Sequence, residues 1–331
     1  TSSVTEYAYK SNFFNPNIFT EYGKSLESGH NFKVMLGFQS ELFKQRDITA
    51  SQDGIMSEVA TLNTTQTNAQ NRGGYSEWAT AGFFGRVNYD WKERYLFTFS
   101  LRHEGSSRFG ENHKWGNFPA VSVGWRISDE KFMKGLSWID DLKVRYDYGV
   151  TGNQEIGNYN SLATYRAFGW YQYNGNRFHV WGPSKNTNSE LRWEKGHNQN
   201  VGLDFSLFSH KVTGSFNYFH RKQSDLLGDY SVPVPPNLFS TIYTNVGTLR
   251  NTGFELDVTV NAVRTKDFTY SFTLVGATNN NKFVSFSNDI YKGQKYYSTC
   301  SMANPNNPGY LQRIEAVSYT HLRAHETCAD L

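Results

Sequence analysis

The stretch YLFTFSLRHEGSSRFG, residues 95–110, decides the fold. After Leu96, the apolar Phe97 and Phe99 alternate with the polar Thr98 and Ser100. A period of two is that of a β-strand with one apolar face and one wet face. The apolar face of such a strand contacts either a protein core or the acyl chains of a lipid bilayer. The period alone does not distinguish these two environments.

Composition favours long strands over a compact aliphatic core. The chain of 331 residues has a mean hydropathy of −0.62, yet aromatic residues make up 16%, with 21 Tyr and 25 Phe. The sequence contains no run of roughly 18 apolar residues, so it predicts no transmembrane helix. The first residues, TSSVTEYAYK, are too polar for a signal peptide. The net charge of +3 is too small to predict a nucleic-acid partner.

The C-terminal stretch VSYTHLRAHETCADL, residues 317–331, changes composition abruptly. It resembles the conceptual translation of a transposon-style sequencing adapter. We therefore expect residues 1–316 to be the native part and the chain to be a fragment. Without the tail, Cys300 is the only cysteine, which predicts no internal disulfide, and His321 and His325 are not metal ligands.

The alternation of apolar and polar residues seen in the opening stretch recurs along the chain. No segment shows the pattern of an amphipathic helix with comparable clarity. The alternation is found in residues 32–39, 83–91, 121–127, 142–148, 201–207, 254–260 and 268–274. We predict an all-β, antiparallel chain.

The connections indicate what the apolar faces contact. Short turns are expected near 27–30, 91–94, 209–211 and 264–267, and long polar stretches at 45–75, 103–117, 151–195 and 221–250. Alternating short and long connections are typical of outer-membrane barrels. The apolar parity of the strands carries no charged residue, and a charge facing mid-membrane lipid costs about 2–4 kcal/mol. The sequence therefore predicts a transmembrane β-barrel.

Two sets of residues follow from this prediction. Those expected to face lipid are Phe97, Phe99, Leu101, Val123, Phe205 and Leu207, with aromatic residues near strand ends, such as Trp91, Trp125 and Trp193, as interface girdles. Those expected to face the lumen, or to hold a plug by polar contacts, are Arg86, Arg126, Lys143, Arg145, Asp147 and Glu255.

Several long segments, in order, resemble the SusC/RagA family of TonB-dependent outer-membrane transporters. They are GHNFKVMLGFQSE (29–41), RYLFTFSLRHEGSSRFGENHKWGNFPAVSVGWRISDEKF (94–132), LKVRYDYGVTGNQEIGNYNSLATY (142–165), LRWEKGHNQNVGLDFSLFSHKVTGSFNYFHRKQSDLL (191–227) and NVGTLRNTGFELDV (245–258).

This resemblance implies a 22-stranded barrel with an N-terminal plug, in the outer membrane of a Gram-negative bacterium. It also implies a SusD-like lipoprotein partner, energy supplied through the TonB complex, and oligosaccharide or peptide substrates. The plug, the TonB-contacting box and the last strands are missing from the chain, so we expect part of a barrel.

Nothing in the sequence predicts catalysis, a cofactor or a metal site, and motifs such as HExxH and CxxC are absent. The best functional candidates lie in residues 159–182, where aromatic rings can stack on sugar C–H faces and amides can bind hydroxyl groups. These candidate substrate residues are Tyr159, Tyr165, Trp170, Tyr171, Tyr173 and Trp181. Packing of loop against loop, or contact with the lipoprotein, would use the same residues.

Two other functions remain open from the sequence. One is a secreted, soluble all-β carbohydrate-binding or hydrolase domain, and the other is a siderophore-type receptor. A soluble domain would bury Phe97, Phe99, Val123 and Phe205 against a second sheet, and this would contradict the membrane interpretation.

Overall fold

The computed structural model describes residues 3–54, 61–64, 67–286, 296–301 and 310–314. The predicted tail 317–331 lies outside these residues, as do His321 and His325 within it. Within the described part of the chain, no helix is both long and apolar enough to cross a membrane.

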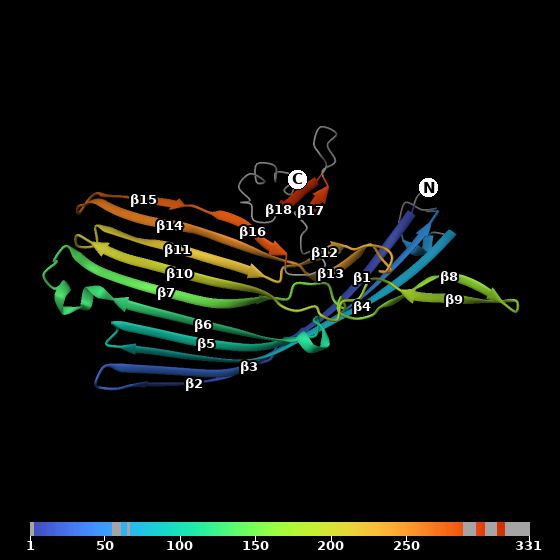
Figure 1. Ribbon diagram of the computed structural model, residues 1–331, viewed down its shortest axis with the longest axis horizontal. Helices are drawn as coiled ribbons and strands as arrows, with labels where there is room; N and C mark the ends of the chain where they lie inside the picture. The colour runs from blue at the N-terminus through green and yellow to red at the C-terminus, as the bar shows by residue number, and fades with distance from the viewer. Residues whose placement is uncertain (1–2, 55–60, 65–66, 287–295, 302–309, 315–331) are drawn as a thin grey trace.

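One large antiparallel sheet forms most of the molecule (Figure 1). Along the sheet, the order is β1-β3-β4-β5-β6-β7-β10-β11-β14-β15, so most neighbours in space are neighbours in sequence. The main strands are β3 (His30–Asp53), β4 (Thr67–Trp91), β5 (Tyr95–Ser106), β6 (Trp115–Arg126), β7 (Ile139–Asn153), β10 (Glu194–Leu207), β11 (Val212–Ser224) and β14 (Gly247–Arg264). The predicted all-β, antiparallel class is confirmed, and the described sheet is not closed into a barrel.

The strands at the two ends of the sheet are interrupted. β1 (Ser3–Phe14) pairs with the second half of β3 and β2 (Asn17–Ser25) with the first half, and Pro16 lies between them. At the other end, β15 (Thr269–Ala277) and β16 (Asn280–Phe286) pair with successive parts of β14. β1 and β2 therefore run along β3 as one interrupted strand, and β15 and β16 run along β14 in the same way.

Two smaller hairpins and several single turns of 3-10 helix complete the connections. The hairpins are β8 (Tyr165–Tyr173) with β9 (Asn176–Pro183), and β12 (Leu227–Ser231) with β13 (Thr241–Asn245); a further pair is β17 (Tyr296–Ser301) with β18 (Tyr310–Ile314). The 3-10 turns are η1 (Leu62–Thr64), η2 (Glu111–His113), η3 (Ile127–Asp129) and η4 (Lys131–Met133).

Short and long connections lie at opposite ends of the sheet (Figure 1). The tight turns predicted from the sequence occur where expected, as at 92–94, where Lys92 and Glu93 have φ of 53° and 55°. Positive φ at two successive residues gives a turn whose twist matches that of the strands it joins. The opposite end of the sheet, which we call the loop end, carries β8–β9 and β12–β13.

One predicted loop is mostly strand. The stretch 45–75 was expected to be a long polar connection, but β3 continues to Asp53 and β4 begins at Thr67, with Arg46 paired to Tyr75. Its many Asn, Thr and Gln residues reflect strands that extend beyond the apolar part of the sheet. Polar composition alone therefore did not indicate a loop.

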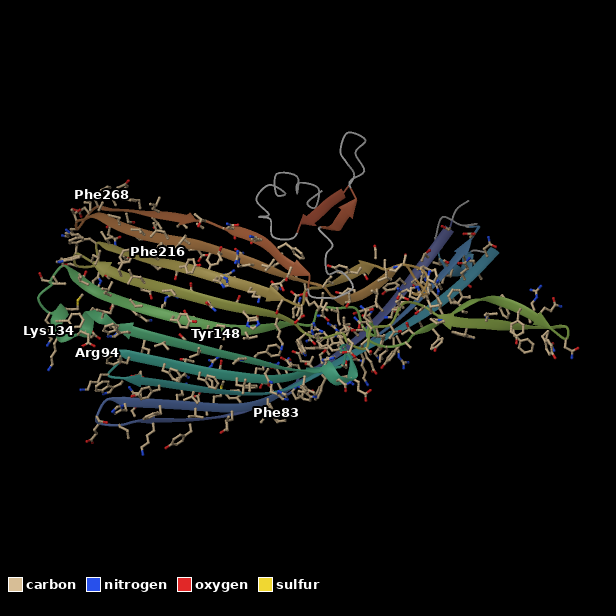
Figure 2. The ribbon with its side chains drawn as sticks, in the orientation of Figure 1. Phe83, Arg94, Lys134, Tyr148, Phe216 and Phe268 are labelled. Atoms are coloured by element: carbon tan, nitrogen blue, oxygen red, sulfur yellow. The ribbon has the colours of Figure 1, made fainter. Side chains whose placement is uncertain are left out.

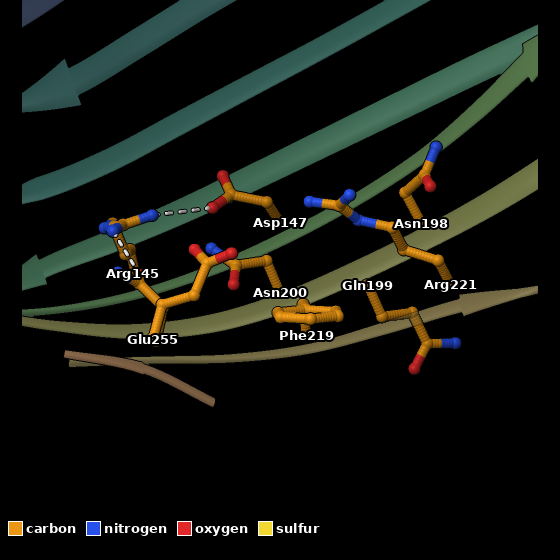
Figure 3. A pocket seen from close by; sticks show the side chains of 9 residues that line it. Arg145, Asp147, Asn198, Gln199, Asn200, Phe219, Arg221 and Glu255 are labelled. Atoms are coloured by element: carbon orange, nitrogen blue, oxygen red, sulfur yellow. Dashed lines mark hydrogen bonds and ion pairs between the residues drawn. The ribbon is translucent and has the colours of Figure 1, made fainter. Parts of the chain in front are cut away.

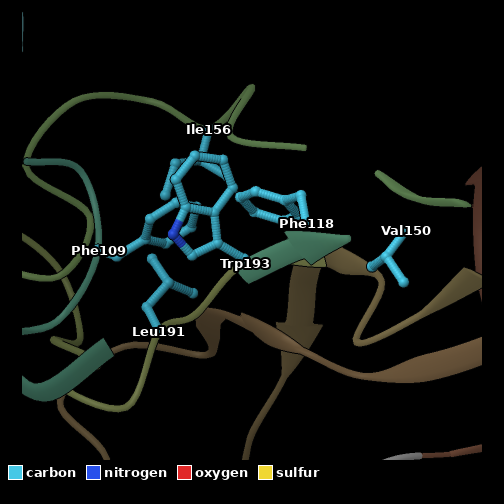
Figure 4. Packing of buried hydrophobic residues seen from close by; sticks show 6 residues of the cluster. All are labelled: Phe109, Phe118, Val150, Ile156, Leu191 and Trp193. Carbon is cyan, nitrogen blue, oxygen red and sulfur yellow. The ribbon is translucent and has the colours of Figure 1, made fainter. Parts of the chain in front are cut away.

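The largest buried cluster lies at the loop end, and we call it the loop core (Figure 4). It consists of Phe109, Phe118, Val150, Ile156, Leu191 and Trp193. The ring of Phe118 lies where a Cβ at Gly116 or Gly152 would be, within 2.6 Å and 2.4 Å respectively. These glycines therefore leave the space that the aromatic core fills.

Trp193 belongs to this core, so its interpretation as an interface girdle was wrong. Trp193 is only 4% exposed, and the centroids of its ring and the Phe109 ring are 4.8 Å apart. Its Nε1–H donates a hydrogen bond to the Lys114 carbonyl at 2.8 Å. A buried indole normally finds such an acceptor. Proximity to a strand end did not separate a core tryptophan from a surface one.

Candidate functional site

One face of the sheet carries a continuous row of apolar side chains. Residues paired across neighbouring strands share a face. The register joins Phe32, Tyr89, Phe97, Val123, Tyr146, Val201, Tyr218 and Phe254 into one row across eight strands. In Figure 2, side chains stand out along these strands, with Phe83, Tyr148 and Phe216 labelled at different strands.

The six residues predicted to face lipid all lie on this apolar face. Phe97, Phe99, Leu101 and Val123 are 39–44% exposed, and Phe205 and Leu207 are half-buried. Among the described strands, no second sheet packs over them, as the soluble alternative requires. Contact with acyl chains remains a prediction for each of these side chains.

The opposite face is polar and is organised around Arg145 on β7. Its guanidinium contacts Asp204 on β10 at 3.2 Å and Asp147 on its own strand at 3.4 Å, and it also bonds the Asn217 side chain on β11. Asp147 in turn accepts a hydrogen bond from Ser122 on β6. Charge-assisted bonds of this kind are among the stronger hydrogen bonds. The network therefore links four neighbouring strands.

Gly202 makes this arrangement possible. It lies opposite Arg145 in the ladder between β7 and β10. A Cβ at position 202 would stand 2.6 Å from Arg145 Cζ and 2.8 Å from Asn217 Oδ1. The absence of a side chain at position 202 leaves the space into which the guanidinium extends.

A groove of about 560 Å³ opens beside this network (Figure 3). It is lined by Arg145, Asp147, Asn198, Gln199, Asn200, Asn217, Phe219, Arg221 and Glu255. The Arg221 guanidinium lies 4.8 Å from the centre of the Phe219 ring, a cation–π distance. Amide, carboxylate and guanidinium groups line the groove together, so it can bind polar groups through several hydrogen bonds.

The six predicted lumen residues are only partly brought together. Arg145, Asp147 and Glu255 line the groove. The other three do not line it. Arg126 lies at the turn end of β6, within 3.6–4.0 Å of the carboxylates of Asp141, Asp129 and Glu93. Lys143 on β7 is paired with Arg126 in the ladder, and Arg86 is exposed on β4. Orientation toward a lumen remains a prediction for all six.

Sequence reasoning missed several groove residues, including Asn198, Asn217 and Arg221. Each occupies the polar parity of its strand. The register would have grouped them, because Asn217 pairs with both Gly202 and Glu255. The parity of single strands was visible in the sequence, but the alignment between strands was not.

Five of the six aromatic candidates lie on the β8–β9 hairpin. Tyr165, Trp170, Tyr171, Tyr173 and Trp181 are 52–70% exposed, and the hairpin extends from the loop end away from the rest of the sheet (Figure 1). These rings are therefore accessible to a ligand or a partner in the described part of the molecule.

Tyr159 is placed differently from the other five. The Glu77 amide donates a hydrogen bond to the Tyr159 hydroxyl at 2.8 Å, and Lys185 Nζ donates to the Tyr159 carbonyl at 2.7 Å. Lys185 also bonds Asn160, and burial lowers the pKa of its ammonium group. These contacts hold Tyr159 within the loop end, where it helps fix the connection that precedes the hairpin.

The described residues contain no group of three or more His, Cys, Asp or Glu side chains that could hold a metal ion. Pairs such as His113 with Glu190, 2.9 Å apart, join two loops instead.

The family model described as TonB dependent receptor-like, beta-barrel matches residues 1–321. The chain belongs to this family. Its relatives include the TonB-dependent receptor P39 of Formosa agariphila, 35% identical over 93% of this chain and 30% of that protein. The TonB-dependent receptor SusC of Bacteroides thetaiotaomicron is 33% identical over 86% of this chain and 28% of that protein.

The same relationship appears in solved structures. A structure of the RagAB peptide transporter superposes on this TonB-dependent receptor chain with a TM-score of 0.82 at 26% identity, covering 96% of this chain and 34% of that one. The chain thus spans about a third of the length of the relatives it matches. Members of this family are outer-membrane β-barrel proteins of Gram-negative bacteria, and these relatives are receptors and transporters, not enzymes.

Proposed function

We propose that the complete protein imports oligosaccharides across the outer membrane, together with a SusD-like lipoprotein and with energy supplied through the TonB complex. The observation that carries this proposal is the two-faced sheet, with an exposed apolar row on one side and the Arg145 network on the other, in a chain 33% identical to SusC.

In this proposal the apolar face contacts lipid. Phe97, Phe99 and Val123 are exposed, and burying exposed apolar surface is favourable by about 25 cal/mol per Å². A bilayer provides the apolar environment without a second sheet. The outer membrane therefore accounts for side chains that would be unfavourable in water.

The polar face lines the lumen in the same proposal. The Arg145 network is satisfied by partners on its own and neighbouring strands, which suits a face near water or a plug. The groove beside it, with Arg221 and Glu255, offers hydrogen-bonding groups to a passing substrate or to a plug segment.

Peptide import is the second candidate function. It is favoured by the similarity to the RagAB peptide transporter, which covers 96% of this chain. Peptides and oligosaccharides both present amide or hydroxyl groups, which the Asn and Gln side chains of the groove can bind.

Deletion of the intact gene in its host tests the proposal. We expect loss of growth on one polysaccharide, restored by the wild-type gene, and unchanged growth on the corresponding monosaccharide. Affinity purification of the receptor should recover a surface lipoprotein in a stoichiometric complex. Growth that is lost on peptides and kept on every polysaccharide would establish the peptide function instead.

A further inference from the structure

One face of the β8–β9 hairpin gathers stacking and hydrogen-bonding groups. The register pairs Trp170 with His179, Gln172 with Arg177, and Ala167 with Trp181, so these side chains share a face. The Trp170 and His179 ring centroids are 3.5 Å apart, and those of His179 and Trp181 are 6.4 Å apart. We call Trp170, Gln172, Arg177, His179 and Trp181 the stacking face.

The hairpin and its flanks are cationic. From residue 156 to residue 189 the sequence contains no Asp or Glu, whereas it contains Arg166, Arg177 and Lys185. Lys185 is engaged at the hairpin base by its bonds to Tyr159 and Asn160. Arg166 lies on the other face, 4.7 Å from the centre of the Phe168 ring. Arg177 is the guanidinium of the stacking face.

Unlike Arg177, several arginines outside the hairpin are paired with carboxylates. Arg145, Arg94 and Arg192 each contact a carboxylate within 3.4 Å. Across the described ranges, no carboxylate forms an ion pair with Arg177. An exposed guanidinium presents its planar donors to carboxylate or sulfate oxygens, which it can bind through two parallel hydrogen bonds.

We propose that the stacking face binds acidic oligosaccharides, with sugar rings lying on Trp170 and Trp181 and a carboxylate or sulfate group bound by Arg177. This inference rests on the proposed oligosaccharide import and names the substrate class. Two indole rings on one face provide flat surfaces for sugar C–H groups. Gln172 adds an amide for hydroxyl groups, and the complete lack of acidic residues over residues 156–189 favours an anionic ligand.

The test uses the complete receptor, expressed from its intact gene and purified in detergent. Binding of an oligogalacturonate is compared by calorimetry with binding of the same oligosaccharide after methyl esterification, which removes the charge and keeps the rings. We expect the acidic form to bind at least about tenfold more tightly, because a hydrogen bond to a charged group is stronger than one to a neutral group. This preference should shrink as salt is added.

A sulfated galactan oligosaccharide and its desulfated form make up a second pair of probes. Preference for the charged member of either pair supports the proposal and identifies the anionic group. Equal binding of charged and neutral members in both pairs overturns it.

Variants separate charge from stacking. Arg177→Gln should remove the preference for the acidic form while leaving binding of the ester unchanged, and Arg177→Lys should restore part of it. Trp170→Ala should weaken binding of both forms. Arg72→Gln, which makes the same charge change at an exposed position on β4, is the matched control and should bind like wild type. A preference that survives Arg177→Gln contradicts the proposal.

Two further outcomes also overturn it and remain distinguishable from failure of the proposed function. If Trp170→Ala loses the co-purifying lipoprotein while sugar binding is unchanged, the stacking face is a protein-docking surface. If cells import neutral oligosaccharides through the receptor and the purified receptor has no acid preference, import stands and the acidic class fails. Deletion that leaves growth on every oligosaccharide unchanged instead removes the proposed import itself.

Discussion

The aromatic residues of the loop core and those of the apolar sheet face share a composition and differ in their surroundings. Trp193 and Phe109 are enclosed by residues of the same chain, whereas Phe97 and Val123 remain about two-fifths exposed with no described element over them. The loop core is completed by folding. The sheet face has no such cover within the described residues, and in the proposed function the outer membrane supplies its apolar environment.

The largest expected effect comes from removing the centre of the loop core. Trp193→Ala should lower the free energy of unfolding by about 3–5 kcal/mol, because it leaves a cavity beside Phe109 and Phe118. Trp170→Ala on the hairpin removes an equally large ring from an exposed site and should change it by less than about 0.5 kcal/mol. Urea unfolding of the complete receptor in lipid vesicles measures both. Equal losses would remove the distinction between the two regions.

A charge on the apolar face should have the next largest effect. Phe97→Arg is expected to destabilise the receptor in a bilayer by about 2–4 kcal/mol, since the guanidinium would face lipid. Thr98→Arg places the same charge on the polar face, one residue away, and should be tolerated. Folding yields and unfolding free energies in vesicles distinguish them. If Thr98→Arg is the more damaging substitution, the two faces have been assigned the wrong way round.

The polar face provides a third, smaller effect. Gly202→Ala should cost about 1–3 kcal/mol, because the new Cβ stands 2.6 Å from Arg145 Cζ and must displace the guanidinium. Gly149→Ala makes the same change where the added atom is 3.5 Å from Ala120 Cβ, an ordinary contact, and should be nearly neutral. Comparable unfolding midpoints for the two variants would show that the Arg145 network adapts freely.

The smallest effect concerns acid sensitivity at the turn end. The hydrogen bond from the Tyr95 hydroxyl lowers the pKa of Glu130, and Trp125 and Arg94 add to this. A carboxyl group with a lowered folded-state pKa stabilises the protein above its unfolded-state pKa, and this contribution is lost as pH falls through the folded-state pKa.

Glu130→Gln should therefore reduce stability at neutral pH and make the urea midpoint less sensitive to acid below about pH 4. Glu155→Gln, at an exposed loop position, is the control. An unchanged pH profile in Glu130→Gln would mean that these bonds contribute nothing to the turn end.

The sequence predicted the class of fold because strand parity is a local property. Phe97 and Thr98 fall on opposite faces whatever the rest of the chain does. The long segments between residues 29 and 258 that resemble SusC/RagA transporters also indicated the correct family. The arrangement of the site could not be read in this way, because the contacts of Arg145 depend on a register set by three neighbouring strands.

Distinctions among the aromatic residues were likewise beyond sequence reasoning. Tyr159 and Tyr165 are six positions apart in the same polar, aromatic stretch. Only the first is fixed by Glu77 and Lys185, and Glu77 lies far away in the sequence. Trp193 was misplaced for the same reason, since the acceptor of its indole N–H is the Lys114 carbonyl on a different connection.

The base of the β8–β9 hairpin has a consequence for evolution. The Ser184 amide bonds the Thr164 carbonyl at 2.8 Å and the two hydroxyl groups bond each other, so the hairpin is closed before its first aromatic residue. None of its rings belongs to the loop core. Mutation, insertion or recombination between residues 165 and 183 can therefore alter the hairpin without disturbing the core. With the ligand role proposed for the stacking face, exchange of this one short segment would change the ligand and leave the fold intact.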